Sequence, residues 1–143
     1  MRTLKRVMVL ALAVGVLGFG ARAAAQPRAT GVQSIVRDAE AEFRRQVNEY
    51  QARIRELDFS RRPNAAARKG MNDTIVNNHR SHLDAITRVR NESRTRISDM
   101  RGVPAAEKNN ALRSLNNVYA TEVRTLRGHE DDALRKLREA ERR

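Results

Sequence analysis

The chain has 143 residues, with 29 lysines and arginines against 17 aspartates and glutamates, so its formal net charge is +12. It contains no cysteine, which excludes a disulfide scaffold, a thiolate metal site and a cysteine nucleophile. Aromatic residues make up only 3% of the chain and no glycine-rich phosphate loop is present, which argues against small β-sandwiches and barrels and against nucleotide-binding enzymes.

Residues 1–25 have the three-part layout of a secretory signal peptide. A basic stretch over residues 2–6 precedes an apolar segment from Val7 to Phe19, and Ala23 and Ala25 supply the small residues of a cleavage site. The apolar segment is shorter than the roughly 20 residues that span a bilayer. We therefore expect cleavage after Ala25 and a periplasmic or secreted protein. An uncleaved N-terminal anchor is the alternative.

Residues 26–143 are expected to form a single helical domain. This part of the chain keeps a net charge of +8, and 22 of its 25 basic residues are arginines. Its large apolar residues number only 26 of 118. So few apolar residues can form only a thin core. Elongated helices of the coiled-coil kind suit this composition, because they bury only a narrow apolar stripe.

The first predicted helix covers residues 31–58. Thr30 and Gln33 match a capping box, in which the two side chains satisfy free backbone N–H groups at the helix start. Apolar residues then recur every three or four positions, which is the spacing of an amphipathic helix. They are Val32, Val36, Ala39, Phe43, Val47, Tyr50, Ile54 and Leu57.

The second predicted helix has two candidate starting points. A polar break covers residues 58–63, and Gly70 weakens the helical signal of the segment that follows it. We therefore expect a helix over residues 64–101 or 72–101. One face of this helix carries Ile75, His79, His82, Ile86, Val89, Ser93, Ile97 and Met100.

A tight turn and a third helix follow. Gly102 occupies the position of a helix C-cap, and Pro104 suits a first helical position. The third helix is predicted over residues 104–140. Its apolar stripe consists of Leu112, Leu115, Tyr119, Val123, Leu126, His129, Ala133, Leu137 and Ala140.

Three amphipathic helices with short connections predict an all-α fold, either an elongated antiparallel three-helix bundle or a set of helical hairpins. The tight turn sets the register of the second and third helices, so residues whose numbers sum to about 205 should lie side by side. Leu134 and Leu137 then extend beyond a second helix that starts at residue 72. Either residues 64–71 are helical and cover them, with Met71 and Ala65–Ala67 facing inward, or two protomers pair their helix ends as a homodimer.

Histidine is the only residue type that suggests a metal site. His79 and His82 are three residues apart on one helix, and the register brings His129 within about one turn of His79. Three imidazoles in one layer would suit Zn²⁺ or Cu²⁺. The alternative is a half-buried polar layer of neutral, hydrogen-bonded histidines, with no cofactor.

The arginine surplus suggests an anionic partner. Six acid-first i, i+4 pairs, such as Glu40–Arg44, account for six basic residues as helix support, and a solvated basic surface is the alternative for the rest. In an exported protein the partner would be an acidic envelope component, such as a polysaccharide, a lipid headgroup contacted peripherally, or an acidic protein. Nucleic acid is not expected, because aromatic stacking platforms are missing. The candidate contact residues are Arg88, Arg90, Arg94, Arg96, Arg135, Lys136 and Arg138.

No arrangement of residues predicts catalysis, so we expect a non-enzymatic protein that works by surface contact. No serine lies in a strand–turn–helix elbow, and no apolar pocket is indicated that would raise the pKa of a carboxyl group.

The general character of residues 26–143 is similar to that of the Spy/CpxP type of small periplasmic helical chaperones and metal-stress proteins. The similarity covers length, signal peptide, basic charge and helical content. Their Leu-Thr-x-x-Gln signature is absent, and the segment nearest to it is Val103–Glu107. The resemblance implies an alternative function, namely holding client proteins or responding to metal stress.

Overall fold

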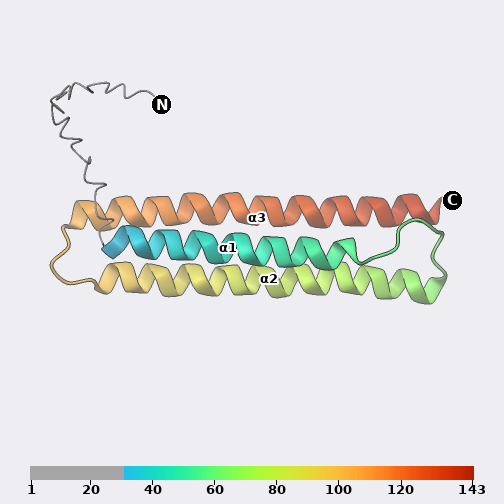
Figure 1. The fold of residues 1–143 in the computed structure, drawn as a ribbon, viewed down its shortest axis with the longest axis horizontal. Helices are drawn as coiled ribbons and strands as arrows, with labels where there is room; N and C mark the ends of the chain where they lie inside the picture. Colours follow the sequence, from blue (N-terminus) through green and yellow to red (C-terminus); the bar gives the residue numbers. More distant parts are fainter. Residues whose placement is uncertain (1–30) are drawn as a thin grey trace, which may run out of the picture.

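The computed structural model describes residues 31–143, which form three helices and no strand. The helices are α1 (Gly31–Arg55), α2 (Ala65–Asp99) and α3 (Ala105–Glu141). They lie side by side as an elongated bundle in which each helix runs antiparallel to the one before it (Figure 1), and each contacts both of the others. The predicted all-α class is therefore confirmed, whereas the predicted signal peptide lies outside the described residues.

Helix α1 ends three residues earlier than predicted. The N–H groups of Glu56 and Leu57 bond to the carbonyls of Arg53 and Ile54, three residues back, at 3.3 and 3.2 Å. Such i to i−3 bonds tighten a last turn and end the helix. Leu57 still packs against the core from the loop that follows, which explains its place in the apolar repeat.

Helix α2 takes the earlier of its two predicted starts. Asn64 is its N-cap, and the side-chain oxygen accepts a hydrogen bond of 2.8 Å from the N–H of Ala67. This bond satisfies one of the free N–H groups at the helix start. The extra turns place α2 beside Leu134 and Leu137, and Leu137 is buried. Met71 packs against the core as expected, but residues 65–67 are exposed, so the expectation that these alanines face inward is wrong.

The turn between α2 and α3 matches the prediction to within two residues. Gly102 has a φ of 73°, a left-handed conformation that favours glycine. Pro104 is the N-cap of α3 rather than its first residue. The Nζ of Lys108 donates a 2.7 Å hydrogen bond to the carbonyl of Ser98 and so satisfies one of the last carbonyls of α2.

The register of α2 and α3 lies within four residues of the predicted one. Thr87 lies beside Tyr119, and Arg90 beside Asn116. Further along, His79 lies beside Glu130, and Arg68 beside Glu141. The core runs along the bundle between the three helices, and each helix contributes fully buried residues to it, among them Phe43, Ile86 and Leu126. None of the described helices has an apolar stretch long enough to cross a membrane.

Two glycines inside the helices provide a test of this assignment. Gly70 lies in α2 and Gly128 in α3, and a Cβ atom added at either position meets nothing within 4 Å. We expect Gly70→Ala and Gly128→Ala each to raise the free energy of unfolding by about 0.5–1 kcal/mol, because alanine loses less backbone entropy in a helix. Urea denaturation measures the change.

Gly102→Ala is the matched control for these two variants. This variant is expected to lower the free energy of unfolding by about 1 kcal/mol, because the left-handed backbone of residue 102 disfavours a side chain. If all three variants had effects of the same sign, the assignment of the helices and the turn would be wrong.

Candidate functional site

A polar layer crosses the middle of the bundle where all three helices meet. Tyr50 of α1 is fully buried, and its ring lies edge-on to the rings of His79 and His82 of α2, with centroid separations of 6.1 and 6.0 Å. Its hydroxyl donates a 3.4 Å hydrogen bond to the carbonyl of Ile75. Burial, reinforced by the negative charge of Glu130, raises the pKa of Tyr50, so the phenol stays protonated.

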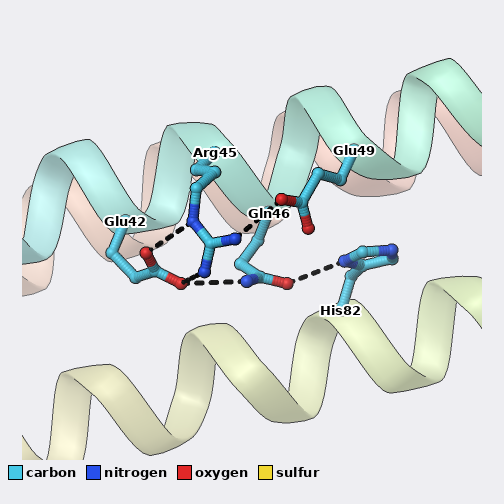
Figure 2. A network of polar contacts seen from close by, with 5 residues as sticks. All are labelled: Glu42, Arg45, Gln46, Glu49 and His82. Atoms are coloured by element: carbon cyan, nitrogen blue, oxygen red, sulfur yellow. Dashed lines mark hydrogen bonds and ion pairs between the residues drawn. The ribbon is translucent and has the colours of Figure 1, made fainter.

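Gln46 connects α1 to α2 in this layer (Figure 2). Its Nε2 donates to Glu42 at 2.9 Å, so its Oε1 is free to accept, and that oxygen lies 2.8 Å from Nδ1 of His82. The proton of His82 is therefore assigned to Nδ1. The Arg45 hydrogen bond lowers the pKa of Glu42, although burial acts in the opposite direction, and the ionised carboxylate orients the Gln46 amide.

The second histidine of the layer faces α3. Nδ1 of His79 lies 3.4 Å from Oε2 of Glu130, and both side chains are largely buried. The layer thus joins α1 to α2 through Gln46 and His82, and α2 to α3 through His79 and Glu130. Every one of these contacts is between polar groups inside the bundle, so the layer fixes how the helices align.

The third histidine lies elsewhere, so the predicted site of three imidazoles does not form. His129 lines a separate depression between α1 and α3, together with Gln51 and Lys136. Neighbouring residues on a helix point about 100° apart, and Glu130, one position on, is the α3 residue that meets His79. Within residues 31–143 no group of three histidine, aspartate or glutamate side chains is arranged to hold a metal ion. The expectation of Zn²⁺ or Cu²⁺ at His79, His82 and His129 is therefore corrected.

The predicted anion-contact residues lie on several sides of the bundle rather than one. Arg135 pairs with Asp132 and Glu139 on α3, at 2.8 and 3.9 Å. Lys136 lines the depression that contains His129, between α1 and α3. Arg88 and Arg96 are exposed, but each is two residues away from Arg90 or Arg94, and so lies on a different face of α2. Of the seven candidates, Arg90, Arg94 and Arg138 remain on one side of the bundle.

That side is the surface where α2 and α3 lie next to each other, away from α1, and we call it the α2–α3 face. Arg90 marks it: Nε donates a 3.0 Å hydrogen bond to Asn116, and its guanidinium lies 4.8 Å from the centre of the Tyr119 ring. Positions three or four residues apart along each helix extend the face from this contact. Its basic residues are Lys69, Arg80, Arg90 and Arg94 on α2, and Arg113, Arg124, Arg127 and Arg138 on α3.

Charge on this face is strongly unbalanced. Its acidic residues at the same spacing are Asp73 and Asp84 on α2 and Asp131 and Glu141 on α3, against eight basic ones. In the described part of the chain none of the eight forms an ion pair within 4.0 Å, whereas α1 carries most of the paired arginines. Five of the eight were not predicted from the sequence, namely Lys69, Arg80, Arg113, Arg124 and Arg127. Their spacing from Arg90 and Asn116 can be read from the sequence. The hydrogen bond between Arg90 and Asn116, which shows how the two helices are oriented, cannot.

Of the six predicted i, i+4 pairs, Glu40–Arg44 is formed in the structure. Glu49 instead pairs with Arg45, and Arg53 with Glu56. Acidic residues therefore pair with three of the five arginines of α1, namely Arg44, Arg45 and Arg53.

Comparisons of the chain with protein-family models, curated proteins and solved structures found no match. Function is therefore inferred from the residues of the chain themselves.

The burial of His82 leads to a pH prediction. Burial lowers the pKa of His82, with Arg53 and Arg45 acting in the same direction and Glu49 opposing them. Because the folded state favours the neutral ring, the stabilisation is present above the unfolded-state pKa of about 6.5 and is lost as the pH falls below it. We expect the free energy of unfolding to decrease between pH 7.5 and pH 5.5, as measured by urea denaturation.

His82→Gln tests the origin of this decrease. A glutamine keeps a hydrogen-bond donor for Gln46 but does not titrate, so the variant is expected to lose part of the pH dependence. His129→Gln, which changes a histidine outside the layer, is the control and should behave like the wild type. Equal pH dependence in the wild type and in His82→Gln would contradict the assignment.

Proposed function

We propose that the protein is an exported, non-catalytic helical protein that binds an acidic component of the cell envelope through the α2–α3 face. One observation carries the proposal: eight basic side chains without ion pairs gather along this face of residues 31–143, against four acidic ones. The signal-peptide pattern of residues 1–25 supports the periplasmic or secreted location, where an envelope component would be the available partner.

The shape of the face suits a long polyanion. Helix α2 has 35 residues and is therefore about 50 Å long. The basic residues of the face follow one another along α2 at intervals of about 6–17 Å, so a long polyanion lying on the helix would contact several of them at once. Single exposed ion pairs contribute little, but several made along one chain contribute together. Arg90 is already held in place by Asn116 and Tyr119, which reduces the entropy lost on binding.

The polar groups of the core support a structural role for the layer rather than a catalytic one. Gln46, His82 and Tyr50 each bond to another residue of the bundle, and Glu130 lies against His79. These contacts hold helices together, and we assign no reaction to them.

Retention on immobilised polygalacturonate tests the proposal. The wild type is expected to bind at 50 mM salt and to be released steeply as salt rises, because screening weakens exposed charges. The fourfold variant Arg80→Gln, Arg94→Gln, Arg113→Gln, Arg127→Gln should bind at least about tenfold more weakly.

A second fourfold variant is the matched control, with Arg37, Arg55, Arg88 and Arg96 changed to glutamine. It has the same net charge, but its changes lie off the α2–α3 face. Equal losses in the two variants would show that binding follows net charge and not this face. Capture of unfolded client proteins that persists at high salt would instead favour the chaperone alternative, since contacts through apolar surface are not weakened by screening.

A further inference from the structure

A cavity lies where the first turns of α2 face the last turns of α3. Its volume is about 440 Å³, which falls within the range of roughly 300–1,000 Å³ found for small-molecule sites. We call it the end cavity. Residues from both helices line it, and those used below are Arg68, Lys69, Leu134, Leu137, Arg138 and Glu141.

The lining combines an apolar part with a basic part. Leu137 is buried and Leu134 is half-buried, so both present hydrocarbon to the cavity. Lys69 lines the cavity from α2 and Arg138 from α3, and both are exposed without an ion pair in the part of the chain that the structure describes. The lining therefore has an excess of positive charge beside apolar surface.

The one carboxylate of the lining is already engaged. Glu141 lies 3.6 Å from Nε of Arg68, across the same two helices. This ion pair leaves Lys69 and Arg138 as the two uncompensated charges. A smaller depression of about 210 Å³ adjoins the cavity, shares Arg68 and Glu141 with it, and adds the exposed Arg62. The surroundings thus extend the positive potential beyond the opening.

We propose that the end cavity binds an amphiphilic anion, that is, a short aliphatic chain with one carboxylate or phosphate group. The chain lies against Leu134 and Leu137, and the anionic group is held between Lys69 and Arg138. Neither part of the lining is sufficient alone: exposed cations bind a hydrated ion weakly, and two leucines offer little apolar surface. A ligand that engages both parts removes apolar area from water and neutralises the unpaired charge at once.

This inference goes beyond the proposed function and does not require it, although Lys69 and Arg138 of the end cavity are also members of the α2–α3 face. The α2–α3 face contacts a long polyanion through charges spread along its length, whereas the end cavity holds one small molecule. A chain that fails to bind polygalacturonate can therefore still bind the amphiphile, and the reverse also holds.

Isothermal titration of residues 26–143 with decanoate tests the proposal. We expect one molecule bound per chain. Decanol, which lacks the charge, and acetate, which lacks the chain, should each bind at least tenfold more weakly than decanoate. Decyl phosphate and inorganic phosphate form a second arm, which decides whether a carboxylate or a phosphate group is preferred.

Variants locate the site. Lys69→Gln with Arg138→Gln is expected to weaken decanoate binding at least tenfold and to leave decanol binding unchanged. Leu134→Ala should weaken the binding of both decanoate and decanol, and thermal melting checks that this variant is folded. Leu134→Ser at the same half-buried position provides a second measurement. The control Arg88→Gln with Arg96→Gln removes the same charge away from the cavity and should bind decanoate like the wild type.

Three results would overturn the proposal. Equal binding of acetate and decanoate would show attraction of an ion to basic surface without a chain site. Equal weakening by the cavity variant and the control variant would place the binding elsewhere. Absence of heat with decanoate and decyl phosphate, confirmed by unchanged thermal stability at saturating ligand, would show that the cavity holds no amphiphile.

Discussion

The tight turn at Gly102 is the constraint on which the rest of the structure depends. Its left-handed backbone and the following Pro104 bring α3 back along α2 with almost no loop, so one register is set for the length of both helices. That register brings Arg90 to Asn116 and His79 to Glu130. The basic face and the end cavity both lie between these two helices, and a shift of one turn would dismantle both.

The polar layer provides what the turn does not, namely the position of α1. A thin apolar stripe of valines, isoleucines and alanines allows neighbouring alignments of similar energy. Gln46 and His82 bond well only in one of them, because a slip would bury their polar groups without partners. The layer thus resembles the buried polar residues that fix register in coiled coils, at some cost in stability.

Sequence patterns predicted the helices well and the functional surfaces less well. The three-to-four-residue apolar repeat and the Gly102–Pro104 signal are local, so they located three helices and their antiparallel turn. The arginines were grouped by nearness in sequence, whereas a surface is defined by helical angle. Arg88 and Arg90 are neighbours in the chain but lie on different faces. The prediction for His129 was wrong for the same reason, because a shift of one position along a helix is enough to turn a side chain away from the layer.

The one-sided charge of the bundle also affects how the molecule approaches a partner. The α2–α3 face carries eight basic residues against four acidic ones, whereas α1 carries five against four, so charge is distributed unequally across the short axis of the bundle. A body with such a transverse dipole experiences a torque near a negatively charged surface. It would rotate before contact and settle lengthwise, with α1 outermost. Orientation would thus be selected during diffusion, over distances longer than any hydrogen bond.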